Sequence, residues 1–275
     1  MAVKVACLQL CSTVDVEANW STFERLSLSA IEEGAQCIFS PENTFFLGAQ
    51  FHKVALAQSL DGPLGQRCAA FAKEHGIYLF LGSMAEQHLD ADGNVDTEKC
   101  YNTSVVYAPT GDRLASYRKI HLFDVDIPGG MSIAESDRVV PGEDAVVVET
   151  EHGQFGLSIC YDLRFPELYR SLQEKGANVL LIPSAFTQHT GEAHWHILLR
   201  SRAIEFQSWV IASAQTGTHD VEGTRQSYGH ALIIDPWGRV IADAQKEEGY
   251  IMADIDLDQV NSVRASMPVE THRRM

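Results

Sequence analysis

Three ionisable side chains lie where predicted β-strands end. Glu42 follows a short apolar strand, Lys119 follows the returning strand of a hairpin, and Cys160 ends the apolar strand predicted at 154–160. The ends of strands in one sheet can converge at a single rim although the residues are far apart in the chain. We therefore expect a carboxylate, an ammonium group and a thiol to meet at one site.

These three groups suit the hydrolysis of a carbonyl compound through a covalent intermediate. The thiolate is the nucleophile, but an unperturbed thiol has a pKa of about 8.5 and is mostly protonated at neutral pH. Glu42 could accept the thiol proton, and Lys119 could stabilise the thiolate and the oxyanion that forms on attack. Each residue alone also has an ordinary explanation as a buried apolar cysteine, a loop-capping carboxylate or a solvated lysine.

Cys160 must be distinguished from five other cysteines. No CxxC motif occurs, and the spacing suggests no disulfide framework, so reduced thiols in a cytoplasmic protein are predicted. Cys7, Cys37 and Cys68 are expected to be small buried apolar residues. Only Cys160 directly precedes a polar turn that contains a proline.

Composition excludes several classes of protein. The 275 residues are 45% hydrophobic, which is enough for a large core. The net charge of −16 argues against general binding to nucleic acid or to acidic membranes, because both need a basic surface. The first ten residues read as a strand and not as a signal peptide, and no apolar run of about 18 residues predicts a membrane span.

The chain alternates between strand-like and helix-like segments without repeats or linkers. This pattern predicts one domain over residues 1–275 with an α/β fold, in which helices cover a sheet-based core. Asp15 is expected to cap the first helix. A loose segment at 124–143, rich in Gly, Pro, Ser and Asp, is expected to be a functional loop because long loops in compact domains often are.

Three segments resemble the nitrilase superfamily of carbon–nitrogen hydrolases. They are Phe-Ser-Pro-Glu ending at Glu42, Tyr-Arg-Lys-Ile-His around Lys119, and Ile-Cys-Tyr-Asp-Leu-Arg-Phe-Pro-Glu around Cys160. Their order and separation also match, over nearly the full chain. The resemblance implies that Glu42 is the general base, Lys119 the oxyanion stabiliser and Cys160 the nucleophile.

The resemblance also implies further features of the site and the fold. The backbone N–H of Tyr161 would be a second oxyanion donor, and Glu135 would be a second glutamate near the thiol. The family fold is an α-β-β-α sandwich whose layers continue across a dimer, so a homodimer or homotetramer is expected. No cofactor and no metal are implied.

Closer resemblance is to the Nit branch, carried by Pro-Ser-Ala-Phe at 183–186 and Asp-Pro-Trp-Gly at 235–238. This implies a thiol amidase that converts the amide of a small carboxylate-bearing substrate to acid and ammonia through a thioester. Deaminated glutathione is the first candidate, and the ω-amides 2-oxoglutaramate and 2-oxosuccinamate are the alternative. Glu192 and His196 depart from the branch pattern near the expected pocket, which leaves the substrate open.

Arg164 lies four residues after Cys160, where its guanidinium could clamp a substrate carboxylate. A structural ion pair with Asp162 or Glu167 is the alternative. The branch resemblance favours the clamp.

Other functional classes have weaker support. His194 and His196 are two residues apart and diverge on a helix, whereas zinc pairs on helices need a spacing of four, so no metal site is predicted. No GxSxG, GxGxxG or Walker motif occurs. A catalytically silent binding protein and an acyl transferase on the same fold remain alternatives. Release of ammonia and product analysis with amine acceptors would distinguish them.

Overall fold

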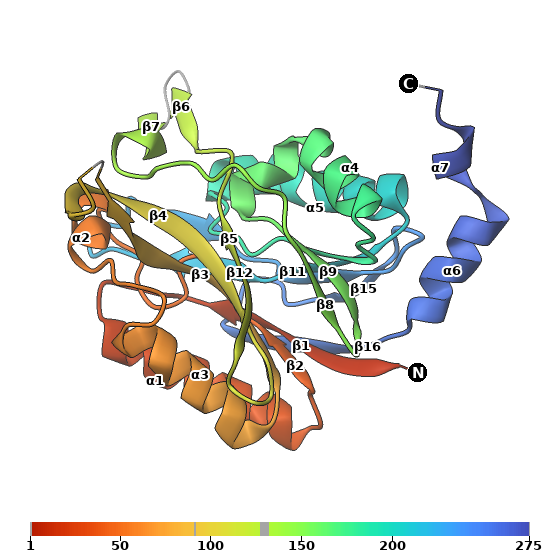
Figure 1. Cartoon of the computed structure of the whole chain (residues 1–275), viewed down its shortest axis with the longest axis horizontal. Coiled ribbons are helices and arrows are strands. Elements are labelled where there is room, and N and C mark those ends of the chain that lie inside the picture. Colours follow the sequence, from red (N-terminus) through yellow and green to blue (C-terminus); the bar gives the residue numbers. More distant parts are fainter. Residues whose placement is uncertain (1, 91, 127–131, 275) are drawn as a thin grey trace.

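The computed structural model describes residues 2–90, 92–126 and 132–274, and within them two β-sheets face each other (Figure 1). The first has eight strands in the order β13-β12-β1-β2-β3-β4-β5, with β16 also paired to β1. Its strands are β1 Val3–Leu10, β2 Cys37–Phe39, β3 Tyr78–Leu89, β4 Val95–Tyr107, β5 Arg113–Arg118, β12 Ala214–Thr218, β13 Gln226–Tyr228 and β16 Gly249–Ile255.

The second sheet has six strands in the order β15-β14-β11-β10-β9-β8. A separate hairpin of β6 and β7 lies at the edge of the molecule. The strands are β6 Asp124–Asp126, β7 Ser132–Ala134, β8 Val147–Thr150, β9 Gly153–Leu157, β10 Val179–Leu181, β11 Trp209–Ala212, β14 Leu232–Ile234 and β15 Val240–Asp243.

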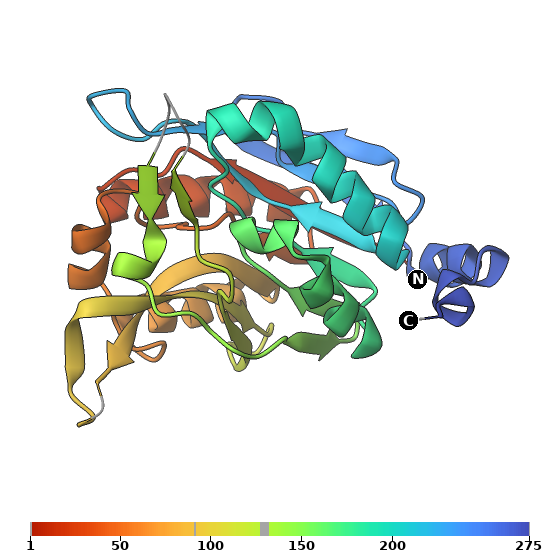
Figure 2. The same ribbon diagram turned by 90° about the horizontal axis from the view of Figure 1, so that it is seen from above.

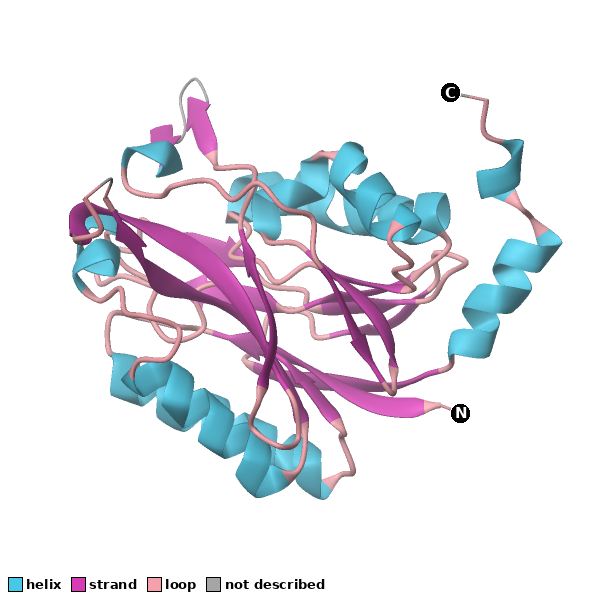
Figure 3. Cartoon of the chain, in the orientation of Figure 1, coloured by secondary structure: helices cyan, strands magenta, loops and turns pink. Residues whose placement is uncertain are grey.

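Helices cover the outer face of each sheet and complete an α-β-β-α sandwich (Figure 3). α1 and α3 lie on the first sheet, and α4 and α5 lie side by side on the second (Figure 2). α6 and α7 project from the body at the C-terminal end. The helices are α1 Val16–Glu32, α2 Gln50–Ala55, α3 Pro63–His75, η1 Glu135–Asp137, η2 Cys160–Arg164, α4 Pro166–Glu174, α5 Gln188–Phe206, α6 Leu257–Ser266 and α7 Val269–His272.

The alternation of side chains along β1 explains why two cores form. Successive residues of a strand point to opposite faces. Val5 and Cys7 pack between the sheets, whereas Ala6 and Leu8 pack toward α1 and α3. Both faces of β1 are therefore buried, as its near-continuous apolar sequence requires.

Aromatic rings join the two sheets. Phe39 of β2 stacks on Phe80 of β3 with ring centroids 4.4 Å apart, and Phe80 lies 4.6 Å from Phe155 of β9. Phe39 also lies 6.0 Å from Phe155. Because β9 leads toward Cys160 and β2 leads toward Glu42, these rings hold the two strands against each other. Large apolar side chains of this kind dominate the stability of such interfaces.

Local signals account for several element ends. Asp15 caps α1 by accepting hydrogen bonds from the N–H groups of Glu17 and Ala18, as predicted. The strand predicted at 154–160 is shorter than expected, because β9 ends at Leu157 and Cys160 begins η2. The predicted loop 124–143 contains β6, β7 and η1, and its residues 127–131 lie outside the described part. None of the described helices is long and apolar enough to cross a membrane.

Candidate active site

Five of the predicted site residues line one cavity of about 420 Å³, namely Glu42, Lys119, Glu135, Cys160 and Tyr161. Glu42 follows β2, Lys119 directly follows β5, and Glu135 and Cys160 are the first residues of η1 and η2. Glu42, Lys119, Glu135 and Cys160 are buried, with exposed fractions of 8% or less. The volume falls in the range of about 300–1,000 Å³ that is typical of small-molecule sites.

Lys119 lies between two buried carboxylates. Its Nζ is 3.1 Å from Oε1 of Glu42 and 2.8 Å from Oε2 of Glu135. Burial alone would lower the pKa of Lys119, but the charges of Glu135 and Glu42 raise it well above its usual value. Lys119 is therefore an ammonium group, and it links the segment after β2 to the segment after β7.

Glu42 is held by donors on both carboxylate oxygens. Asn102 Nδ2 donates to Oε1 at 2.8 Å, and the backbone N–H of Ala185 donates to Oε2 at 2.9 Å. Burial tends to raise the pKa of Glu42, but the positive charges of Lys119 and Lys53 and the Ala185 hydrogen bond outweigh it, so the pKa is lowered. The carboxylate is therefore ionised and able to accept a proton.

Cys160 has an unusual backbone conformation. Its φ of 49° lies in the left-handed region, which non-glycine residues adopt rarely and often at functional sites. Its N–H donates to the carbonyl of Pro183 at 3.0 Å, which ties the start of η2 to the end of β10. The next N–H, of Tyr161, belongs to the first turn of η2 and has no partner within that helix.

The Cys160 thiol is protonated in the resting site. Burial and then the negative charge of Glu42 raise its pKa well above the usual range, and Lys119 only partly opposes them. For this thiol to act as a nucleophile, a proton acceptor would have to remove its proton. Glu42 is the carboxylate close enough to influence the thiol through a side-chain hydrogen bond.

Asp162 connects the lysine segment to the cysteine segment. This fully buried carboxylate accepts hydrogen bonds from the Tyr117 hydroxyl at 2.7 Å, from His121 Nδ1 at 2.7 Å and from the Ile159 N–H at 2.8 Å. The ring of His121 also stacks on Phe165. The turn that carries Cys160 is thus fixed to the strand that precedes Lys119.

Gly82 of β3 allows the Glu42 segment to approach closely. A Cβ at this position would lie 2.1 Å from the Ser40 carbonyl oxygen and 2.3 Å from that of Pro41. The N–H of Gly82 also donates to Ser40 Oγ at 3.1 Å. Backbone packing therefore places the residues that lead to Glu42.

The carbon–nitrogen hydrolase profile matches residues 4–265, which is nearly all of the chain. The chain belongs to the carbon–nitrogen hydrolase family. This agrees with the family expected from the three segments, and the α-β-β-α fold expected from that resemblance is confirmed.

Curated relatives of this hydrolase match it over nearly its whole length. Deaminated glutathione amidase of Dictyostelium discoideum is 43% identical, with 97% of this chain and 92% of the relative covered. The protein of the same name from Homo sapiens is 41% identical, with 98% and 82% covered.

Solved structures agree with this relationship. The Caenorhabditis elegans NitFhit protein is 38% identical with a TM-score of 0.89, and the match covers 99% of this chain but only 65% of that one. Saccharomyces cerevisiae Nit3, described as a member of branch 10 of the nitrilase superfamily, is 31% identical with a TM-score of 0.86, and 100% and 97% of the two chains are covered.

Arg164 is not among the described residues that line the hydrolase cavity. Its guanidinium nitrogens lie 3.3 Å from Nδ1 of His194, and it packs 5.3 Å from the ring centroid of Phe186. Phe186 lines the cavity, so Arg164 contacts a lining residue without being part of the lining itself. Within residues 132–274, which the structure describes, Arg164 forms neither of the structural ion pairs considered for it, with Asp162 or with Glu167.

Glu192 and His196 were expected near the pocket. Neither is among the described residues that line the cavity, although Thr190, two residues before Glu192, is. His196 of α5 turns toward Asp243. The arginine that does line the cavity is Arg225, which follows β12 and bonds to the carbonyl of Gly48. Sequence analysis missed Arg225, since no strand end or motif distinguishes it.

Proposed function

We propose that the protein is a thiol amidase that hydrolyses the amide of a small carboxylate-bearing substrate, most directly deaminated glutathione. The main support is the arrangement of Cys160, Glu42 and Lys119 in one buried cavity. The names of the 40–43% identical relatives support the substrate. A catalytically silent binding protein would have no use for a buried ammonium group between two glutamates beside a thiol.

In the acylation step, Cys160 Sγ attacks the amide carbon while Glu42 accepts the thiol proton. Because the resting thiol is protonated, proton transfer accompanies formation of the C–S bond. Glu42 then donates this proton to the amide nitrogen as the C–N bond breaks. The amine leaves, and a thioester remains on Cys160.

Two donors serve the oxyanion. Lys119 has three N–H groups, and two of them point to Glu42 and Glu135, which leaves one for the substrate oxygen. The backbone N–H of Tyr161 is the second donor. Glu135 acts through Lys119, which it contacts by its Oε2. This oxygen also accepts a hydrogen bond from the Phe123 N–H at 2.7 Å, which holds the Glu135 carboxylate in place.

In the deacylation step, water replaces the amine. Glu42 takes a proton from the water as the water oxygen attacks the thioester carbon. The proton returns to sulfur when the C–S bond breaks. The amine product depends on the substrate. For deaminated glutathione, the ammonia expected from the sequence is corrected to cysteinylglycine, because the nitrogen of its γ-amide belongs to the cysteine residue. Only a primary amide releases ammonia.

Arg225 is the candidate for holding a substrate carboxylate. It is the arginine among the described residues that line the cavity. A guanidinium can bind a carboxylate through two parallel hydrogen bonds. We assign this role to Arg225 in place of Arg164.

The test is a substrate comparison with purified protein. Deaminated glutathione, 2-oxoglutaramate and 2-oxosuccinamate are incubated separately, and the 2-oxo acid, ammonia and cysteinylglycine are quantified. We expect the highest kcat/KM for deaminated glutathione, with equal amounts of cysteinylglycine and 2-oxo acid, and no turnover by Cys160→Ala. Equal or faster turnover of the ω-amides would reject the substrate assignment.

The homo-oligomer and the cytoplasmic location are further parts of the proposal. Exposed apolar residues lie on α5 and on the adjacent β14–β15 turn, where Arg200 Nε bonds to the Gly238 carbonyl at 2.8 Å. Ile197 is 67% exposed and Trp237 is 50% exposed. Grouped apolar exposure of this kind is typical of association surfaces. The free cysteines are consistent with a reducing compartment.

A further inference from the structure

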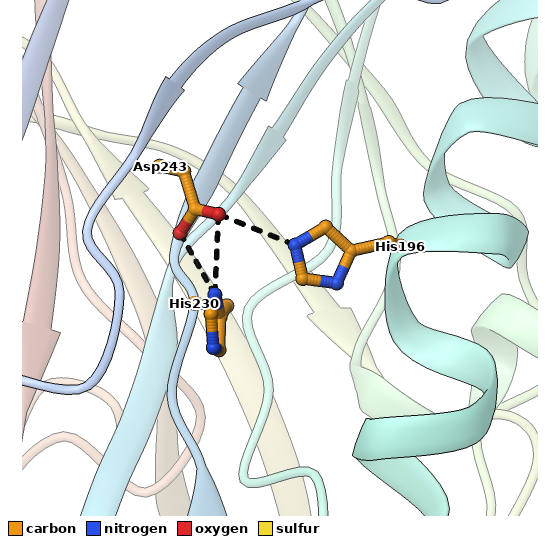
Figure 4. Close-up of side chains that lie close together, drawn as sticks. All are labelled: His196, His230 and Asp243. Atoms are coloured by element: carbon orange, nitrogen blue, oxygen red, sulfur yellow. Dashed lines mark hydrogen bonds and ion pairs between the residues drawn. The ribbon is translucent and has the colours of Figure 1, made fainter.

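Two histidines and an aspartate converge outside the candidate active site (Figure 4). His196 Nε2 lies 3.3 Å from Oδ2 of Asp243, and His230 Nδ1 lies 3.0 Å from Oδ1 of the same residue. One ligand atom from each residue lies within 4.8 Å of the other two. The residues come from α5, from the segment between β13 and β14, and from β15.

The neighbouring residues hold the His230 imidazole in this position. The backbone of His230 has a φ of 56°, its carbonyl accepts a hydrogen bond from Trp195 Nε1 at 2.7 Å, and its N–H donates to the Gln245 carbonyl at 2.6 Å. The ring of Tyr228 stacks on the imidazole with centroids 4.6 Å apart. The position of His230 is therefore determined by groups other than Asp243.

We propose that His196, His230 and Asp243 form a binding site for a divalent transition-metal ion, with zinc as the reference ion. Tetrahedral zinc with bonds of about 2.0–2.1 Å places neighbouring ligand atoms about 3.3 Å apart. Oδ2 of Asp243 lies 3.1 Å from His230 Nδ1 and 3.3 Å from His196 Nε2, which is close to this spacing. Two imidazoles and one carboxylate also form a ligand set that suits such ions.

The exposure of the site leaves room for a fourth ligand. The side chains of His196, His230 and Asp243 are 33%, 12% and 19% exposed. Water can therefore reach the ion and complete the tetrahedron. Histidines close in sequence predict no metal site, whereas this set spans 48 positions and forms only when α5 packs over the sheet that contains β15.

The site would act as a structural clasp. A bound ion would join α5, the segment before β14, and β15. Without the ion, only hydrogen bonds to the Asp243 carboxylate join these three elements. His230 lies three residues beyond Ser227, which lines the active-site cavity. Because the metal binds only the folded state, the melting temperature is expected to rise as the metal concentration increases.

The test is equilibrium dialysis of the full chain against Zn²⁺, with parallel melting curves in EDTA and in Zn²⁺. We expect one ion per chain in the wild-type protein and in Cys160→Ala, where the active-site thiol cannot contribute. His196→Gln and Asp243→Asn should each weaken binding by about tenfold or more. Both should remove the zinc-dependent rise in melting temperature.

The matched control is His88→Gln. His88 Nδ1 lies 2.9 Å from Oδ2 of Asp96, so this pair has the same chemistry without a second histidine. The His88→Gln variant should bind zinc like the wild type. Zinc binding that is unchanged in His196→Gln, or that is lost in Cys160→Ala or His88→Gln, would overturn the proposal. The His196 side chain is one third exposed, so its substitution keeps the test valid if Asp243→Asn does not fold.

Discussion

At the scale of residues, the central feature is one ammonium group that serves two buried carboxylates. Glu42 and Glu135 would each be costly to bury alone, since an unpaired buried charge is strongly destabilising. Lys119 compensates both and keeps one N–H for the proposed oxyanion. The same arrangement leaves Glu42 ionised and Cys160 protonated, so the resting site contains a ready base beside a latent nucleophile.

Glu42→Gln should remove the base and preserve the fold. The amide keeps the shape of the side chain and an oxygen for the Ala185 N–H, but it cannot accept the thiol proton. We expect kcat/KM to fall by about 10²–10⁴-fold. Steady-state kinetics with deaminated glutathione measures this, and circular dichroism verifies folding. Glu86→Gln is the matched control, since Glu86 is a buried carboxylate paired with Arg118 away from the thiol. Similar losses in both variants would contradict the role of Glu42.

The lowered pKa of Glu42 predicts the acid limb of activity. The carboxylate stays ionised below the ordinary glutamate pKa of about 4.3, so kcat/KM should decline only below that pH while the protein stays folded. The same shift stabilises the fold above pH about 4.3, and this contribution is lost as the pH falls through the lowered pKa. A pH–rate profile with circular dichroism at each pH tests both statements.

Lys53→Met should move this acid limb to higher pH, because Lys53 is one of the charges that lower the pKa of Glu42. Lys73→Met removes an exposed lysine of α3 and should leave the profile unchanged. If the acid limb lies at the same pH in the wild type, Lys53→Met and Lys73→Met, this electrostatic explanation is ruled out.

At the scale of elements, strand ends and tight backbone contacts position the site. β2, β5 and β9 each lead to one of the three proposed catalytic residues, and Asp162 ties η2 to the end of β5. These connections are hydrogen bonds and close backbone packing, so small changes of shape there should affect activity without altering any catalytic group.

Gly82→Ala tests this idea. The added methyl group would overlap the carbonyl oxygens of Ser40 and Pro41, so β3 must move away from the Glu42 segment. We expect a destabilisation of about 1–3 kcal/mol in urea unfolding and a lower kcat. Gly249→Ala is the control, since a Cβ there meets no atom within 4 Å and Gly249 has no positive φ. Wild-type stability and kcat in Gly82→Ala would show that the close contact is unimportant.

At the scale of the whole molecule, the two sheets and their outer helices bury most of the large apolar side chains. The apolar surface that stays exposed on α5 and the β14–β15 turn is therefore available for association. Large exposed apolar patches are uncommon on monomeric proteins. The proposed dimer would cover this surface.

Ile197→Arg should weaken the proposed dimer. Ile197 lies on the exposed face of α5, and a buried arginine charge without a partner opposes association. Analytical ultracentrifugation over a concentration series should show a dimer for the wild type and a shift toward monomer for the variant. Val14→Arg alters an equally solvent-facing valine on another surface and should remain dimeric. A monomeric wild-type protein would reject the proposal.

The sequence alone determined most of the elements and the residue types on which the proposed chemistry rests. Alternation of apolar residues marked β1, Asp15 marked the start of α1, and three segments marked Glu42, Lys119 and Cys160. Local patterns of this kind are readable because strand period, helix caps and reactive residue types are properties of short stretches.

Only the tertiary structure decided which distant residues meet. Asn102 holds Glu42 across 60 positions, Arg225 lines the cavity that Arg164 does not reach, and His196 meets Asp243. These contacts depend on the register of strands and the packing of α5 over the sheet that contains β15. The physical reason is that contact between distant side chains is set by the geometry of packed elements, which no local stretch of sequence contains.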